Sequence, residues 1–377
     1  MTPLNPAYTV HEVTFALSDL GAAAVVASPD QAEAASAAAR LGLPVIRLRA
    51  GAGPVSGWYE LESDIPESTA GRREGAPTPD DIALLLHTSG TTSWPKLVPL
   101  THRNLCLSAV AETLRLVPGD WCLSVMPFFH IHGLVAGLLA SLSAGACVLC
   151  PPGFQATSFL SWLQCSQATW YTAVPTMHQA ILARARRHAD ALARHKLRVI
   201  RSSSSPLYPG VWEQIQTVFG VPVLNSYGMT EAGHQISSVR LDGGSGSRTT
   251  VGLSSGPEIA IMDSHGRLLP PGETGEVVLR GAQITSGYLK PREANALAFQ
   301  DNWFRTGDEG LLDSRGELVL TGRIKEVINS GGEKGLSLRS GRSAAYASRS
   351  RSGRGVRGAS RDAGRAGHGG CCAPRRF

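Results

Sequence analysis

The sequence predicts an α/β fold in which helices cover parallel sheets and a small antiparallel β subdomain follows. Helical and buried-strand patterns alternate up to about residue 226, which is typical of parallel sheets covered by helices. After residue 250, short strand patterns alternate with Gly and Pro turns. The 377 residues, of which 42% are hydrophobic, are enough for a large core and more than one domain.

The first expected helix shows the pattern most clearly. Val13, Ala16, Leu17 and Leu20 lie at helical spacing, and Gly21 is a helix-ending residue. The expected elements of the first fifty residues are a helix at 11–20, a strand at 22–27, a helix at 32–40 and a strand at 44–48.

The rest of the chain continues this alternation after a surface connection at 51–79, which is rich in Gly, Pro and acidic residues. Helices are expected at 102–116 and 175–193. Strands are expected at 82–86, 124–127, 169–174, 197–202, 221–226, 258–263, 275–280 and 317–321.

The run 131–150 is apolar over about the length of a membrane span. Glycines and serines interrupt it, and Pro151 and Pro152 follow. We therefore expect a buried helix followed by a buried strand, and no membrane span. Seven scattered cysteines and an N-terminus without a basic or apolar leader segment indicate a reducing, cytoplasmic location.

Positive charge is concentrated at the C-terminus. Residues 335–377 carry ten arginines and one acid, whereas residues 1–334 carry 26 basic and 29 acidic side chains, a net charge of −3. The tail has few large apolar residues, so we expect it to be disordered. Arginines can bind nucleic-acid phosphates, but a GC-rich gene translated out of frame yields the same composition. No nucleic-acid partner is therefore expected.

The segment 84–96, LLLHTSGTTSWPK, joins a short apolar strand to a loop of hydroxyl and glycine residues. Glycine allows close backbone approach, consecutive N–H groups form an anion nest, and Lys96 adds a positive charge. The segment lacks the second glycine, and the Ser or Thr after lysine, of the common nucleotide-binding phosphate loop. A cluster of Ser and Thr is more often a solvated loop, but the strand before it and Pro95-Lys96 after it favour a phosphate site.

This segment resembles the phosphate loop S/T-S-G-S/T-T-G-x-P-K of the adenylate-forming enzymes, a family that includes the acyl-CoA synthetases. Ser93 replaces the usual glycine, as in some members that resemble oxalate–CoA ligase. The resemblance implies that the loop binds the phosphates of ATP. The residues implied are Thr88, Ser89, Gly90, Thr91, Thr92 and Lys96.

The segment 227–231, YGMTE, follows an expected strand and matches the family motif Y-G-x-T-E. An aromatic face can stack on adenine, a threonine can contact phosphate and a carboxylate can hold Mg²⁺. Without this context Glu231 would more often be a solvated loop acid. The resemblance implies that Glu231 is the magnesium ligand, and it implies nucleotide binding by Asn225, Ser226, Tyr227 and Thr230.

Three further motifs follow in the family order. WFRTGD implies that Asp308 binds the ribose hydroxyls, a task that suits a short carboxylate on a glycine turn. GRIKE implies that Arg323 binds ribose and phosphate and that Lys325 lies at the hinge of a small domain. Gly332 lies in a segment similar to the one that contacts the pantetheine of coenzyme A.

The carboxylic acid is expected near the segment FFHIHG. His130 and His132 could form a metal site, but no third ligand is near in the sequence. The resemblance favours instead a carboxylate pocket edged by His130, Ser204 and His234, although His234 could also be a loop histidine without substrate contact. The segments RSSSS and GMTEAGHQ look more like oxalate–CoA ligases than coumarate or fatty-acid ligases, whereas Val239 departs from the asparagine of that subgroup.

The motifs together predict an ATP-dependent carboxylate–CoA ligase with ATP, Mg²⁺, coenzyme A and a small carboxylic acid such as oxalate as its cofactors and substrates. In this family the carboxylate attacks the α-phosphorus of ATP, and the thiolate of coenzyme A then displaces AMP from the acyl-adenylate. The loop lysine and Mg²⁺ would stabilise the transferring phosphates. The residues expected to act in catalysis are Lys96, Thr230, Glu231 and Lys325.

The expected organisation is a nucleotide- and carboxylate-binding α/β core at 1–250, a β subdomain at 251–321, a hinge at 322–334 and the tail at 335–377. By resemblance, the start of the large domain is missing, and the small C-terminal domain with its catalytic lysine has no counterpart. The alternative function is therefore a defective ligase fragment that keeps at most nucleotide binding. The sequence does not indicate an oligomeric state.

Overall fold

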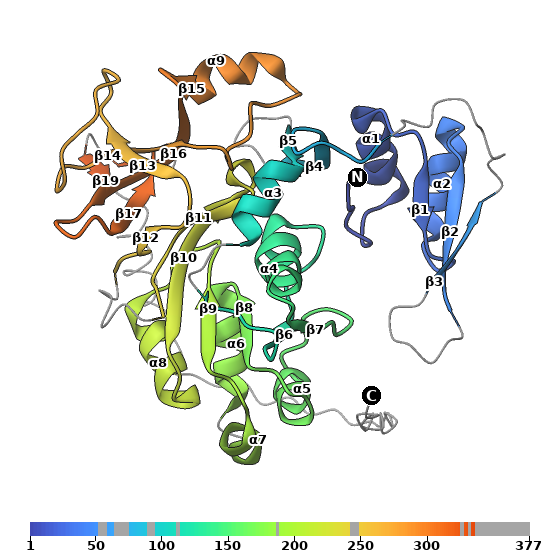
Figure 1. Cartoon of the computed structure of the whole chain (residues 1–377), viewed down its shortest axis with the longest axis horizontal. Coiled ribbons are helices and arrows are strands. Elements are labelled where there is room, and N and C mark those ends of the chain that lie inside the picture. Colours follow the sequence, from blue (N-terminus) through green and yellow to red (C-terminus); the bar gives the residue numbers. More distant parts are fainter. Residues whose placement is uncertain are drawn as a thin grey trace, which may run out of the picture. The chain divides into compact units, whose positions relative to one another are not determined.

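The computed structural model describes residues 1–51, 59–63, 75–88, 95–110, 114–185, 188–241, 249–324, 328–330 and 333–335. Almost all of the expected tail lies outside these residues. The chain forms two compact units (Figure 1), one of residues 2–78 and one of Met1 with residues 79–377. Each unit is described by itself.

The unit of residues 2–78 contains two helices and a three-stranded sheet. The periodicity predicted both helices and the first two strands, whereas the third strand, at 59–63, lies in the segment that was expected to be a surface connection. Thr9 and Glu12 form a reciprocal capping box at the start of the first helix, and Gly21 ends that helix in the left-handed conformation. β1 pairs with β2 in parallel, and β3 pairs with β2 in antiparallel. The elements are α1 (Val10–Leu20), β1 (Val25–Ala27), α2 (Ala32–Leu41), β2 (Val45–Ala50) and β3 (Tyr59–Ser63).

The second unit is organised around a seven-stranded sheet in the order β12-β11-β10-β9-β8-β6-β7. The five strands from β10 to β7 are parallel, which confirms the predicted parallel sheet, and β11 and β12 are antiparallel. The strand predicted at 124–127 lies three residues earlier. The strands are β6 (Trp121–Ser124), β7 (Cys147–Leu149), β8 (Trp170–Ala173), β9 (Val199–Ser202), β10 (Val223–Met229), β11 (His234–Ser238) and β12 (Leu253–Ser254).

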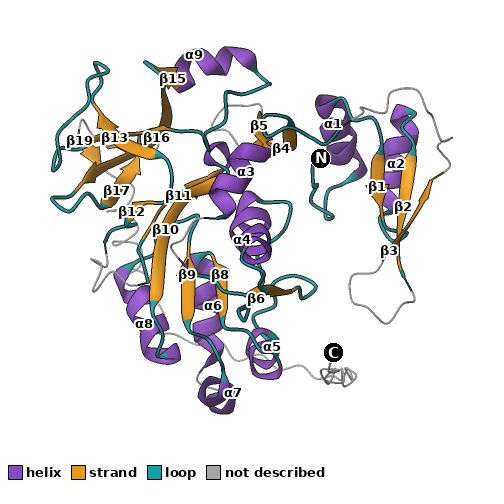
Figure 2. Ribbon diagram, in the orientation of Figure 1, coloured by secondary structure: helices purple, strands orange, loops and turns teal. Residues whose placement is uncertain are grey.

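Helices α5 (Phe159–Cys165), α6 (Pro175–Ala185) and α8 (Pro209–Phe219) pack on this sheet, as Figure 2 shows. Their buried side chains form one hydrophobic cluster with residues of β6, β8, β9 and β10. The helix predicted at 175–193 is wrong as a single helix, because α6 ends at Ala185 and α7 (Ala189–Arg194) follows.

The apolar run 131–150 forms a π-helix, η2 (His132–Leu139), then α4 (Ala140–Ser143) and β7, which confirms the predicted order of helix and strand. The prediction of a buried strand is wrong, because Cys147 of β7 is exposed and Val148 and Leu149 are half-buried. Within the described ranges, no helix is long and apolar enough to cross a membrane. The helix predicted at 102–116 is shorter in the structure, since α3 (His102–Ala109) ends seven residues earlier.

The strand before the phosphate loop is one half of a hairpin. β4 (Ile82–Thr88) pairs in antiparallel with β5 (Lys96–Thr101), which sequence reasoning did not predict. Leu84, Leu86, Val98 and Leu100 of this hairpin belong to the hydrophobic cluster that also contains buried residues of the β subdomain.

The β subdomain is antiparallel, as predicted, and its five strands form a single sheet. It contains β13 (Glu258–Met262), β14 (Gly275–Arg280), β15 (Phe299–Gln300), β16 (Trp303–Leu312) and β17 (Leu318–Arg323). Two short helices, η4 (Arg292–Ala294) and α9 (Asn295–Ala298), precede β15, and a hairpin of β18 (Ile328–Ser330) and β19 (Glu333–Gly335) follows.

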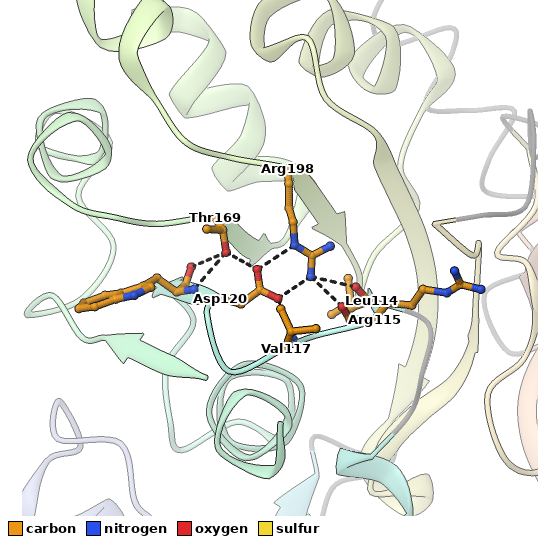
Figure 3. A network of polar contacts seen from close by, with 7 residues as sticks. Leu114, Arg115, Val117, Asp120, Thr169 and Arg198 are labelled. Carbon is orange, nitrogen blue, oxygen red and sulfur yellow. Dashed lines mark hydrogen bonds and ion pairs between the residues drawn. The ribbon is translucent and has the colours of Figure 1, made fainter. Parts of the chain in front are cut away.

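Asp120 joins the starts of three neighbouring parallel strands (Figure 3). It lies just before β6, and it accepts hydrogen bonds from Thr169 before β8 and from Arg198 before β9. The backbone N–H of Val117 also donates to this carboxylate. Burial raises the pKa of Asp120, but the hydrogen bonds from Arg198, Thr169 and Val117 outweigh it, and the pKa lies below its ordinary range.

Candidate functional site

Tyr227, Asp308 and Arg323 meet although they come from three different strands. The hydroxyl of Tyr227 donates to one oxygen of Asp308, and Nε of Arg323 donates to the other oxygen at 2.9 Å. Both Tyr227 and Asp308 are buried, whereas Arg323 is exposed. Burial, followed by the charge of Asp308, raises the pKa of the Tyr227 phenol. The arrangement places a carboxylate and a guanidinium next to an aromatic ring.

Glu231 lies in a second polar group with Tyr288 and Lys96. The hydroxyl of Tyr288 donates to Oε1 of Glu231 at 2.8 Å, and Nζ of Lys96 lies 4.4 Å from the centre of the Tyr288 ring. Burial is the main cause that raises the pKa of Glu231, with Asp308 adding to it and Tyr288 and Lys96 opposing it. The charges of both polar groups therefore act on Glu231.

The carboxylate of Glu231 is suited to act as a ligand of Mg²⁺. No cluster of three or more His, Cys, Asp or Glu side chains suited to a metal ion occurs in the described part of the chain. Mg²⁺ is commonly held by one or two carboxylates, with substrate phosphates and water completing its coordination. A single buried carboxylate beside a lysine suits that arrangement, because the phosphates would supply further oxygen ligands.

The phosphate loop connects the two strands of the hairpin. Thr88 and Lys96 are paired residues at the end of β4 and the start of β5, so both ends of the loop are placed by the hairpin. The predicted loop residues Ser89, Gly90, Thr91 and Thr92 lie outside the described residues, as do Lys325 and Gly332.

Other predicted nucleotide residues lie on or just after β10. The amide of Asn225 donates to the backbone carbonyl of Thr250 at 3.1 Å, and Ser226 is buried and accepts from Arg201. Thr230 begins the short 3₁₀ helix η3 (Thr230–Ala232), directly before Glu231. The YGMTE motif thus spans the change from strand β10 to helix η3, and its polar residues Thr230 and Glu231 lie in η3.

Two of the predicted carboxylate residues are brought together through His132. Oγ of Ser204 lies 3.0 Å from Nδ1 of His132, and the rings of His132 and His234 are 4.9 Å apart. Nε2 of His132 lies 2.7 Å from Oγ1 of Thr172. His130 is exposed and contacts the ring of Phe129, with ring centres 4.7 Å apart.

Sequence reasoning missed three residues of these groups: Tyr288, His132 as an organising residue, and Arg201. Tyr288 lies in the segment TSGYL, outside the motifs to which the sequence assigned a role. Arg201 precedes the four serines 202–205 and stands two residues after Val199 in the same strand. Arg201 could have been found as a charged residue within an otherwise largely apolar strand pattern, where a charge is unusual.

The chain matches the family model described as "AMP-binding enzyme" over residues 1–289. The chain belongs to the AMP-binding enzyme family. Over 341 residues, it is also 44% identical to a protein named oxalate–CoA ligase from Arabidopsis thaliana, covering 88% of this chain and 65% of that protein. These matches confirm the resemblance that the motifs predicted.

Solved structures of AMP-binding enzymes confirm the fold class. ATP-bound MatB from Rhodopseudomonas palustris is 29% identical and superposes with a TM-score of 0.75, covering 90% of this chain and 66% of that one. O-succinylbenzoate coenzyme A synthetase from Bacillus subtilis, in complex with ATP and magnesium ion, is 28% identical with a TM-score of 0.69, covering 88% and 65% of the two chains. The chain thus spans about two thirds of the length of these relatives.

Proposed function

We propose that this chain uses Mg·ATP to convert a small carboxylic acid, with oxalate favoured, into an acyl-adenylate, as the first step of an ATP-dependent carboxylate–CoA ligase. The observation that carries the proposal is the contact of Glu231 and Lys96 with Tyr288, beside the group of Tyr227, Asp308 and Arg323. The names of the similar proteins support the reaction and the acid.

The nucleoside would bind through Tyr227, Asp308 and Arg323. A carboxylate that accepts from a phenol and a guanidinium in the protein alone can accept from the two ribose hydroxyls instead. Asn225, Ser226 and Thr230 lie on the same strand-to-helix segment, and we assign them to the adenine and phosphate side of this site.

The phosphates would bind between the loop 88–92 and Glu231. Mg²⁺ held by Glu231 would neutralise charge that develops on the transferring phosphates. Lys96 adds a fixed positive charge from the first residue of β5. Binding both reactants in this way brings the acid carboxylate to the α-phosphorus, so that the attack becomes effectively intramolecular. The new bond joins a carboxylate oxygen to the α-phosphorus, and pyrophosphate leaves as the bond from the α-phosphorus to the bridging oxygen breaks.

The second step needs coenzyme A, whose thiolate would displace AMP from the acyl-adenylate. We assign Gly332 to its pantetheine and Lys325 to the hinge that changes position between the two steps. His130, Ser204 and His234 are assigned to the carboxylic acid.

The experiment that tests the proposal is ATP–pyrophosphate exchange with a panel of oxalate, malonate, acetate, coumarate and a medium-chain fatty acid. We expect exchange with the small dicarboxylates, and a loss of at least about 100-fold in Lys96→Met, because a fixed charge on the phosphates is removed. Lys196→Met, which changes an exposed lysine, is the control and should exchange normally. Absence of exchange with every acid, from folded protein that binds no ATP, contradicts the proposal.

A further inference from the structure

One face of the parallel sheet changes from apolar to polar at the carboxyl ends of its strands. Ser124 of β6 pairs with Thr172 of β8, and Thr172 pairs with Arg201 of β9. Two positions earlier on each strand, and therefore on the same face, the residues are apolar and form one hydrophobic cluster that includes Cys122, Trp170 and Val199. The polar row is thus confined to the strand ends.

This row lies where the connections between strands change direction. β7 lies on one side of β6, and β8 lies on the other side (Figure 1). In open parallel sheets, ligands bind outside the carboxyl ends of the strands at such a switch point. The row therefore occupies the position in the sheet where the fold places a ligand.

Arg201 brings a positive charge into this row, and the described part of the chain places no negatively charged partner beside it. The residue is only 2% exposed, and its Nε donates to Oγ of Ser226 at 2.9 Å while a terminal nitrogen donates to the side-chain oxygen of Gln235. Both acceptors are neutral. Within the described part of the chain, no carboxylate lies at ion-pair distance from Arg201.

Two other arginines of this unit, whose side chains are partly exposed, each have a carboxylate partner. Arg198 pairs with Asp120, and Arg305 pairs with Glu276. Removing a charge from water is unfavourable unless an opposite charge or hydrogen bonds compensate, and burial accordingly lowers the pKa of Arg201 to about 10. A fully buried guanidinium without such a partner indicates a place for an anion from outside the protein.

His234 supplies a second unused group next to this charge. Its side chain is fully buried, and neither ring nitrogen has a hydrogen-bond partner among the described residues. Its backbone φ of +99° is a conformation that non-glycine residues rarely adopt. Burial, and then the charge of Arg201, lowers the pKa of His234. A lowered pKa favours the neutral imidazole, which has one N–H donor.

The His132–Ser204 contact leads from this buried pair toward the surface. Ser204 is exposed, and its Oγ lies 3.0 Å from Nδ1 of His132. His132 contacts the ring of His234. On the other side, a Cβ added to Gly228 of the nucleotide motif would lie 3.2 Å from Cε1 of His234. Arg201 and the ring of His234 thus lie between an exposed serine and the expected nucleotide site. Among the described residues, Arg201 has no carboxylate partner and the ring nitrogens of His234 have no hydrogen-bond partner.

We propose that Arg201 binds the non-reacting carboxylate of a small dicarboxylate, with His234 as a second hydrogen-bond donor, and thereby selects doubly charged acids over monocarboxylates. The planar guanidinium can bind a carboxylate through two parallel hydrogen bonds. A short dicarboxylate held in this way directs its other carboxylate toward the nucleotide motif. This inference rests on the proposed function and names the residue that determines its substrate class.

The test is calorimetric titration of the full chain with oxalate and with acetate, with no nucleotide present. We expect oxalate to bind more tightly than acetate. Arg201→Met should weaken oxalate binding by about 100-fold or more, since one partner of a buried charge pair is removed. Arg201→Lys should retain part of the affinity, because it keeps the charge and loses the planar pair of donors. Arg184→Met, in the last turn of α6, is the control and should bind oxalate normally.

Thermal unfolding separates this role from a structural one. If Arg201 binds a substrate anion, Arg201→Met should unfold at the same or a higher temperature than the unchanged protein without oxalate, and oxalate should no longer raise that temperature. If Arg201→Met does not fold, a loss of at least about 10-fold in Arg201→Lys still supports the proposal.

Unchanged oxalate binding in Arg201→Met, or in Arg201→Lys when Arg201→Met does not fold, overturns the inference. Equal binding of oxalate and acetate by the unchanged protein also overturns it. A different set of results would contradict the proposed function while leaving the inference about Arg201 intact. In that case oxalate binding still depends on Arg201, but the protein binds no ATP and catalyses no pyrophosphate exchange.

Discussion

The hydroxyl of Tyr227 donates a hydrogen bond to the carboxylate of Asp308, and this contact joins the parallel sheet to the β subdomain. The two residues are 81 positions apart in the chain. Arg323 approaches the same carboxylate from the neighbouring strand β17. Asp308 therefore accepts hydrogen bonds from both the Tyr227 phenol and the Arg323 guanidinium.

Asp308→Asn should weaken ATP binding by about 10-fold or more, because a charged acceptor for hydroxyl groups is replaced by a neutral amide. Calorimetric titration with ATP and with AMP measures the effect, and both nucleotides should lose affinity because they share the ribose. Asp301→Asn is the control, since Asp301 is exposed on the same subdomain and has a positive φ that Asn tolerates. Equal nucleotide affinity of the two variants would exclude Asp308 from the ribose site.

Glu231→Gln should remove the effect of Mg²⁺ on ATP binding and reduce pyrophosphate exchange by about 100-fold or more, because the only charged metal ligand of the proposal is lost. Titration with ATP, with and without Mg²⁺, measures the first effect. Glu273→Gln changes an exposed turn glutamate and should keep the Mg²⁺ dependence. A Glu231→Gln variant that still binds ATP more tightly with Mg²⁺ would contradict the assignment.

The same variant has a predicted pH dependence of stability. Because burial raises the pKa of Glu231 above its ordinary value of 4.5, the folded state binds this proton more tightly than the unfolded state. The stabilisation is complete at low pH and is lost as pH rises through the folded-state pKa. Glutamine cannot lose a proton, so the melting temperature of Glu231→Gln relative to the unchanged protein should increase as pH rises. A difference that stays constant with pH would contradict this prediction.

Asp120→Asn should lower the free energy of unfolding by about 2–3 kcal/mol at neutral pH, because Arg198 loses its carboxylate partner. The pKa of Asp120 is lowered, so its contribution is present above the unfolded-state pKa and is lost as pH falls through the folded-state value. Urea unfolding of both proteins at several pH values should show the difference shrinking at acidic pH. A difference that grows on acidification would exclude this ion pair as its cause.

Gly228→Ala should cost about 3 kcal/mol or more in unfolding free energy and disrupt the site. A Cβ at this position would lie 1.9 Å from the backbone oxygen of His234. Because the clashing atom belongs to the backbone, no change of side-chain rotamer can relieve the clash. Gly210→Ala is the matched control, because Gly210 has open space around it in the first turn of α8. That variant should be unchanged or more stable by up to about 1 kcal/mol. Similar stabilities of the two variants would show that β10 and β11 can separate without cost.

Local sequence signals predicted the elements whose causes are local. The apolar residues at helical spacing lie within α1, and the left-handed Gly21 follows it directly, so a short window of sequence is sufficient. The same holds for the turn-separated strands of the β subdomain. In contrast, β5 was missed because its pairing with β4 is a contact between two segments of the chain, and the periodicity within one segment does not describe such a contact.

The sequence by itself determined the family, through motifs that appear in order, and with it the residues Lys96, Tyr227, Glu231, Asp308 and Arg323. Only the tertiary structure decided which of them share a partner. Tyr288 and Glu231 are 57 positions apart and form one hydrogen bond. The tertiary structure also decided that Arg198 has a carboxylate partner, whereas Arg201, three residues later, has none in the described part of the chain. Helix and strand preferences depend on neighbours in the sequence, whereas burial and charge pairing depend on which distant segments the fold brings together.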